Sequence, residues 1–404
     1  MAVPGRFWRF VGGMLMAAGV AFVALQASDL LQPPSPAPFP GHGEAFAAMS
    51  VDPLALAGGF PQRILAPLLA HVIGLDGPRF PVFQQLCSGL LLAVVFWCCR
   101  ARGANVVAAT AITVAIAGTG AVQVYKLLAG YSDSLNLMLL LVAAQCGHRP
   151  VLFWGAVLLS AFSHEMVFFF VPWLLWHRHR HGGVWWRELL VLGGIAGLYK
   201  GWRMYVATAA TAQAFDATYY VSNNFFPLGT AWLWGCLLLM WLVLYGPLLC
   251  VFVWAWRTDA LGWGRLGPLL FLAGMAVMFV FAYDVQRFCN FIFVPLALAC
   301  VPFLARRGTA VPFASAWLVA LGIYRWQHPP PGTAGGELLA NVTQRLLEVG
   351  AYHDYSRAWT LVVPAIWPGI AALVGVAVVV VAAGFWAARR WPPRDTAATD
   401  RCSW

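Results

Sequence analysis

The stretch that decides the fold is residues 151–176, VLFWGAVLLSAFSHEMVFFFVPWLLW. It is long enough to cross a membrane once, but basic residues flank both ends and Ser163-His164-Glu165 lies in its middle. A single crossing would leave one basic cluster outside and a carboxylate near the centre of the bilayer. Two short helices keep both basic clusters inside and place Glu165 at the outer tip. The sequence therefore predicts a helical hairpin, a form typical of proteins that line a cavity.

The composition around this hairpin is that of a membrane protein. Of the 404 residues, 61% are hydrophobic and 10% are charged. A bilayer core about 30 Å thick needs roughly 20 apolar residues per helix, and nothing alternates like barrel strands. We predict an all-α polytopic integral membrane bundle of about 12 segments, some short or re-entrant, forming a single domain over 1–404. The predicted segments are 8–28, 64–75, 81–99, 104–124, 133–146, the hairpin 151–176, 186–202, 227–256, 266–283, 288–305, 311–324 and 361–388.

The charges that give the net charge of +10 are distributed as this topology requires. Arginines gather at alternate loops, as at Arg100 and Arg102 or Arg306 and Arg307, whereas the opposite loops hold most of the acidic residues. This positive-inside asymmetry predicts a multi-pass protein of the cell inner (plasma) membrane with both termini cytoplasmic, in contact with membrane lipid and not with nucleic acid. The predicted outer loops are 29–80, 200–226 and 325–360, and the predicted cytoplasmic tail is 389–404.

Ionisable residues recur where the predicted segments meet the outer face, and such residues indicate function by default. Asp29 alone fits a helix-ending interfacial residue better than a catalytic base or metal ligand. Arg63 either extends toward the interface or holds a phosphate through paired hydrogen bonds. The helix dipole alone explains Asp133, and Asp284 with Arg287, three residues apart, forms either an ion pair or an anion site. The candidates are Asp29, Arg63, Asp133, His164, Glu165, Asp284 and Arg287.

The order of the motifs around these residues carries a resemblance. An acidic residue after the first segment is followed by F-P-x-R-I-L-x-P-L-L at 60–69 and Y-x-D at 131–133. His164-Glu165 with Pro172 and then D-x-x-R-F at 284–288 complete the series. The series resembles uncharacterised bacterial membrane proteins grouped near the GT-C superfamily of glycosyltransferases.

This resemblance implies a membrane enzyme of the cell envelope whose outward-facing cavity takes a sugar from a polyprenyl-phosphate-linked donor. It implies that Asp29 deprotonates the acceptor and that Arg63 and Arg287 hold the donor phosphate. Asp133 and Glu165 would shape the cavity, with His164 and Asp284 completing the substrate-binding set.

Two other classes of protein stay open. A transporter or flippase for a lipid or an anionic solute would use the same arginines, and it predicts polar groups that continue to the cytoplasmic side. A non-catalytic membrane subunit predicts polar groups that pair off locally. No cofactor is certain and a divalent metal stays open. The alternating His-Arg stretch at 177–181 favours a solvated cytoplasmic face, because its arginines would repel a metal cation.

Overall fold

The computed structural model describes residues 4–27, 42–56, 60–122, 131, 133–209, 241, 245, 248–280, 289–304, 371, 374–375, 378–379 and 381–390. Throughout these residues every regular element is an α-helix or a 3-10 helix, so the predicted all-α class is confirmed. Contacts divide the chain into two compact units, residues 1–117 with 122–215 and residues 118–121 with 216–404. The single membrane domain stays a prediction.

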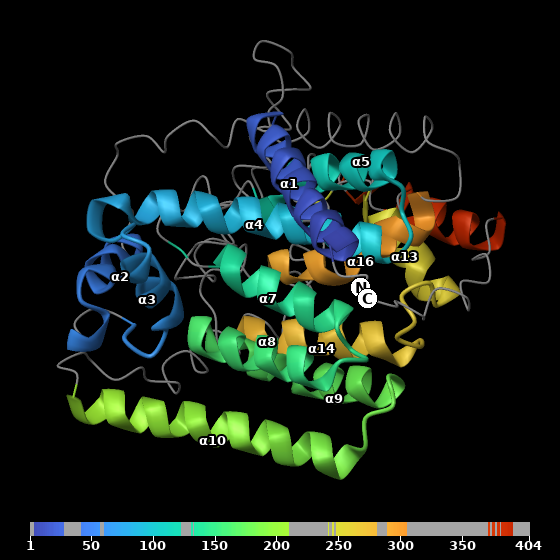
Figure 1. Ribbon diagram of the computed structural model, residues 1–404. Helices are drawn as coiled ribbons and strands as arrows, with labels where there is room; N and C mark the ends of the chain where they lie inside the picture. The colour runs from blue at the N-terminus through green and yellow to red at the C-terminus, as the bar shows by residue number, and fades with distance from the viewer. Residues whose placement is uncertain are drawn as a thin grey trace. The chain divides into compact units, whose positions relative to one another are not determined.

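The helices of the first unit follow most of the predicted segments (Figure 1). The unit contains α1 (Pro4–Ala27), α2 (His42–Val51), α3 (Leu65–Val72), α4 (Phe80–Ala101), α5 (Val106–Ala117), α7 (Asp133–Gln145), α8 (Pro150–Ser163), α9 (Val171–Arg180) and α10 (Trp185–Ala209). Three short 3-10 helices are η1 (Pro53–Ala55), η2 (Gly77–Arg79) and η3 (Glu165–Phe170). The segment predicted at 133–146 is α7, and the segment predicted at 64–75 contains the eight-residue α3.

The hairpin predicted at 151–176 is confirmed. Helix α8 ends because His164 adopts an extended backbone, with φ −162° and ψ 124°. The His164 side chain accepts a hydrogen bond from the N–H of Met166, which caps η3. At the far end of α9, Arg178 donates a hydrogen bond to the carbonyl oxygen of Gly147, just before α8 begins. Helix α9 therefore returns to the start of α8, as a hairpin requires.

Helix α10 then runs in the same direction as α8. Near the start of both helices, Trp154 of α8 donates a hydrogen bond to Glu188 of α10. Near the end of α8, the ring of Phe162 packs against Tyr199, with centroids 6.0 Å apart. The outer loop predicted from residue 200 is wrong at its start, because α10 continues to Ala209. Those residues hold no proline and one glycine, so nothing in the sequence ends the helix at residue 200.

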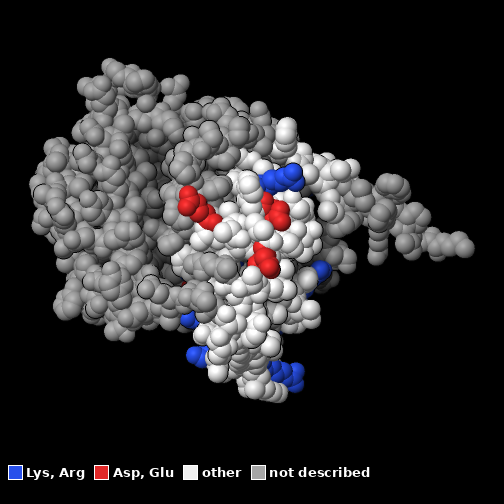
Figure 2. All heavy atoms as spheres, turned by 90° about the vertical axis from the view of Figure 1, so that its left-hand side faces the viewer, with Lys and Arg blue, Asp and Glu red and all other residues white. Residues whose placement is uncertain are grey.

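Helix α4 lies at the centre of the first unit, where it packs against α1, α5 and α7. At one end, α2 and α3 pack together around buried apolar side chains that include Phe46, Ala66, Phe80 and Tyr131. Figure 2 faces this end, which lies on the left of Figure 1, and shows acidic and basic side chains exposed on it. The core around α2 and α3 holds the turn at 60–63, which carries the first candidate site residue.

The second unit contains the described parts of the later segments. They include α13 (Leu248–Thr258), α14 (Leu266–Val280), η4 (Asn290–Ile292) and α16 (Phe293–Leu304). Helices α13 and α16 pack together, with the rings of Trp254 and Phe303 edge to face at 5.1 Å. The hydroxyl of Tyr245 donates to the carbonyl oxygen of Asn290 at 2.9 Å, which fixes the start of η4. The predicted segment 311–324 lies outside the described residues.

In the described part of the chain, one helical stretch, Gly77–Ala101, is long and apolar enough to cross a membrane. Helices α7 and α8 are apolar but have 13 and 14 residues. At 1.5 Å per residue each extends roughly 20 Å, which is short of a bilayer core of about 30 Å. The number of crossings and the re-entrant elements therefore stay predictions.

Candidate functional site

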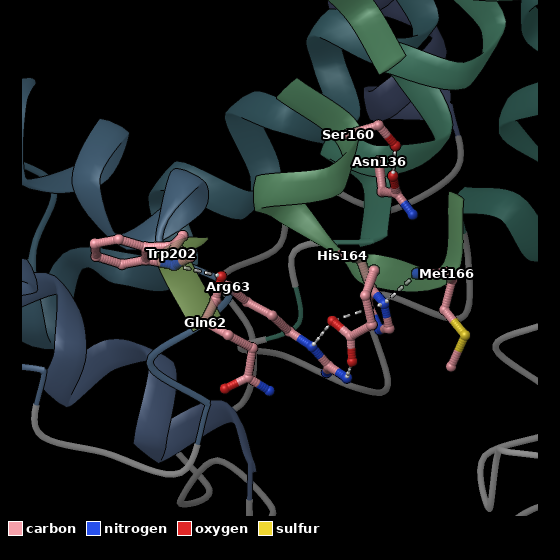
Figure 3. Close-up of polar contacts among 8 residues, drawn as sticks. Gln62, Arg63, Asn136, Ser160, His164, Met166 and Trp202 are labelled. Atoms are coloured by element: carbon pink, nitrogen blue, oxygen red, sulfur yellow. Dashed lines mark hydrogen bonds and ion pairs between the residues drawn. The ribbon is translucent and has the colours of Figure 1, made fainter. Parts of the chain in front are cut away.

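A bidentate ion pair between Arg63 and Glu165 joins two of the predicted motifs. Nε of Arg63 donates to Oε2 of Glu165 at 3.0 Å and Nη2 donates to Oε1 at 2.6 Å, across 102 positions of sequence (Figure 3). The side chains are 9% and 22% exposed. Two parallel N–H···O bonds fix both the position and the plane of a guanidinium group. Arg63 is therefore held in one defined orientation.

The F-P-x-R motif forms a hydrogen-bonded turn that directs Arg63 toward η3. The N–H of Arg63 donates to the carbonyl oxygen of Phe60 at 2.9 Å, and Nε1 of Trp202 in α10 donates to the carbonyl oxygen of Gln62 at 3.1 Å. The guanidinium carbon lies 4.6 Å from the centre of the Phe60 ring, which stacks on Phe46 at 5.7 Å. The aromatic face adds cation–π attraction to the ion pair.

Glu165 is the first residue of η3, at the tip of the hairpin between α8 and α9. Nδ1 of His164 lies 3.8 Å from Oε2 of Glu165, and Tyr199 of α10 also lies beside the carboxylate. The paired hydrogen bonds from the Arg63 guanidinium favour the charged form of the Glu165 carboxyl, so Glu165 occupies Arg63 as an anion.

Buried polar side chains continue from this pair along α4, α7 and α8. The hydroxyl groups of Ser88 and Ser134 lie 3.0 Å apart, and the hydroxyl of Ser160 donates to Oδ1 of Asn136 (Figure 3). Among the described residues, Nδ2 of Asn136 and Oγ of Ser163 are buried without a hydrogen-bond partner. Buried polar atoms usually have partners, which include ordered water. This group therefore forms a polar region inside otherwise apolar helices.

Ser163 belongs to a motif that stands out in the sequence, whereas Ser88, Ser134, Asn136 and Ser160 were not predicted. One signal could have found Asn136: it lies three residues after Asp133, so both side chains share one face of α7. The sequence gives no such signal for the three serines, because single serines are common in helices that pack closely.

The structure brings together some of the predicted site residues. Arg63, His164 and Glu165 form one cluster, and Asp133 is 2% exposed at the start of α7, two residues after Tyr131. The ring of Tyr131 contacts Phe46, which stacks on the Phe60 ring below Arg63. The other three candidates, Asp29, Asp284 and Arg287, lie outside the described residues. Over the ranges that the structure describes, no group of three or more His, Cys, Asp or Glu residues could hold a metal ion.

A second bidentate ion pair lies at the other end of the hairpin. Nε and Nη2 of Arg178 donate to the two carboxylate oxygens of Glu188 at 3.2 and 2.8 Å. Nη1 of Arg178 donates to the carbonyl oxygen of Gly147, and Trp154 donates to Glu188. The Arg178 and Glu188 side chains are only 5% and 8% exposed. These bonds join α8, α9 and α10 at one end and engage every nitrogen of the guanidinium group.

The prediction of a solvated face at 177–181 is wrong for its first two residues. His177 is 1% exposed and its ring stacks on Trp173, while Arg178 lies over the ring of Phe153. Residues 179–181 are exposed, as predicted. The error arose because the partner of Arg178 lies across a turn on the next helix, where sequence spacing gives no warning of an ion pair.

Comparisons of the chain with protein-family models, with curated proteins and with solved structures found no match. The resemblance to GT-C enzymes therefore rests on the sequence motifs alone and stays a prediction.

Proposed function

We propose that this protein is a polytopic membrane glycosyltransferase of GT-C type, which transfers a sugar from a polyprenyl-phosphate-linked donor on the outer face of the inner membrane. The observation that supports the proposal is the ion pair between Arg63 and Glu165. It links the F-P-x-R motif to the H-E motif, two elements of the series on which the resemblance depends. Arg63 is also the type of side chain best suited to hold a phosphate through paired hydrogen bonds.

The proposed reaction divides the work between an acid–base group and cationic groups. Asp29 takes the proton from the acceptor hydroxyl as that oxygen forms a new bond to the sugar C1 carbon. The bond between C1 and the phosphate oxygen breaks, and the electron pair leaves with the polyprenyl phosphate. Arg63 and Arg287 stabilise the charge that grows on this departing phosphate. Asp133, His164 and Asp284 orient the sugar.

A transfer assay tests this proposal. The purified full-length protein in lipid bicelles is incubated with radiolabelled polyprenyl-phosphate sugars, and release of polyprenyl phosphate is measured. We expect turnover by the natural protein, and loss of turnover with retained donor binding in Asp29→Asn. Arg63→Ala should weaken donor binding. Absence of turnover with every donor, or unchanged turnover in Asp29→Asn, would contradict the proposed function or the proposed base.

A second candidate function is a transporter or flippase for a lipid or an anionic solute. The buried pair of Arg178 and Glu188 favours it, because charged groups then lie at both ends of the hairpin. Transport of a fluorescent phosphate-bearing lipid across reconstituted vesicles distinguishes the two. Transport without release of polyprenyl phosphate supports the second candidate, and turnover without transport supports the glycosyltransferase.

A further inference from the structure

The two ion pairs differ in how many N–H donors they use. Arg178 engages all three of its nitrogens, two with Glu188 and one with the carbonyl oxygen of Gly147. Among the residues that the structure describes, Arg63 has a single acceptor, Glu165, which takes Nε and Nη2. A guanidinium group has five N–H donors in a planar fork. Arg63 is therefore held by the hydrogen bonds of one partner, whereas Arg178 is held by those of two.

The two carboxylates also differ in how firmly they are held. Glu188 is 8% exposed, lies within α10 and accepts a further hydrogen bond from Trp154. Glu165 is 22% exposed and lies at the start of a six-residue 3-10 helix, directly after the extended His164. His164 and Tyr199 lie beside the Glu165 carboxylate, so both side chains can stay in contact with it when it moves away from Arg63.

We propose that Glu165 is an intramolecular competitor, which occupies Arg63 until the phosphate group of a ligand displaces it. A phosphate binds the guanidinium fork with the same paired geometry as a carboxylate. The two anions compete because both use the Nε and Nη2 edge and repel each other in a partly buried site. The inference rests on the proposed function for its class of ligand, a prenyl-linked phosphate, which is a diester in the sugar donor and a monoester in the released polyprenyl phosphate.

A binding experiment on the full-length protein in detergent tests this competition. The probes are farnesyl monophosphate, inorganic phosphate and farnesol, and the readout is the Kd of each probe. Removing a competitor raises the fraction of protein that can bind, so Glu165→Gln should tighten phosphate binding roughly tenfold. Arg63→Gln should weaken it by about the same factor. Glu188→Gln, the matched change in the second pair, should leave the Kd within about twofold.

Each outcome decides the proposal. Unchanged or weaker phosphate binding in Glu165→Gln overturns it, as does tightening that persists in the Arg63→Gln/Glu165→Gln double variant. Equal binding of farnesol overturns it too, since farnesol carries no phosphate. If Glu165→Gln binds only farnesyl monophosphate more tightly, the ligand is a lipid headgroup. If it binds inorganic phosphate more tightly by the same factor, the ligand is a free anion. If Glu165→Gln does not fold, Glu165→Asp serves instead: its shorter carboxylate should give a smaller tightening, and an unchanged Kd overturns the proposal.

The transfer assay separates this inference from the proposed function. Sugar transfer by the natural protein, with no tighter phosphate binding in Glu165→Gln, supports the proposed function and contradicts the role of Glu165 as a competitor. Tighter phosphate binding in Glu165→Gln, with no sugar transfer from any donor, supports the phosphate site and contradicts the proposed glycosyltransferase activity.

Discussion

Arg178→Gln should destabilise the protein more than Arg63→Gln does, although each change removes one partner of a bidentate pair. Loss of Arg178 leaves the Glu188 carboxylate, 8% exposed, with the hydrogen bond from Trp154. Removing one partner of a buried pair costs about 3–5 kcal/mol. Glu165 is 22% exposed and water reaches it, so Arg63→Gln should cost about 1–3 kcal/mol.

Thermal unfolding of the detergent-purified variants, followed by circular dichroism, measures this difference. In a domain of roughly 150–250 residues, the size range of the first unit, about 1 kcal/mol shifts Tm by roughly 2–4 °C. The Tm of Arg178→Gln should therefore fall by roughly 6–20 °C. The double variant Arg178→Gln/Glu188→Gln should recover part of that loss, because it leaves no uncompensated charge. The reasoning is refuted if Arg63→Gln lowers Tm as much as Arg178→Gln, or if the double variant is no more stable than Arg178→Gln.

Three further predictions follow from local contacts and from the topology. Trp202→Phe removes the hydrogen bond to the carbonyl of Gln62, so it should cost about 1 kcal/mol in thermal unfolding and weaken binding of farnesyl monophosphate. Gly147→Ala places a Cβ 2.5 Å from Nε2 of His177 and should cost about 1–3 kcal/mol, whereas Gly193→Ala meets nothing within 4 Å and should not destabilise. A green fluorescent protein fused to the C-terminus should fluoresce and a fused alkaline phosphatase should be inactive, because the positive-inside rule places that end in the cytoplasm; an active phosphatase contradicts the topology.

The hairpin was predictable because its sequence leaves few alternatives. For a membrane protein, a carboxylate at mid-membrane and a basic cluster on the outer side would both be costly, so the sequence of residues 151–176 predicts that the chain turns back. The break itself follows from His164, whose side chain caps η3. The sequence also predicts that Arg63 and Glu165 both lie at the outer face of the membrane. Their direct pairing could not be predicted, since no spacing rule connects positions 102 residues apart.

The second ion pair shows the limit of reasoning from charge alone. The sequence rule that places arginines at the cytoplasmic face treats Arg178 as one of several solvated groups. Its burial depends on the Phe153 ring near the start of α8 and on the Gly147 carbonyl just before that helix. Gly147 leaves room for the approach of α9, as the nearness of His177 shows. Only the folded hairpin brings these groups together.

The two pairs lie at opposite ends of the same hairpin, and their differences indicate different roles. In the pair of Arg178 and Glu188, every guanidinium nitrogen donates a hydrogen bond, and three helices meet there. Breaking it would release α8, α9 and α10 from each other at that end. The pair of Arg63 and Glu165 connects a turn with a short 3-10 helix, so it can open while the helices stay packed. An exchange of anions is therefore less costly at Arg63 than at Arg178, which makes the hairpin tip the place where a phosphate can enter.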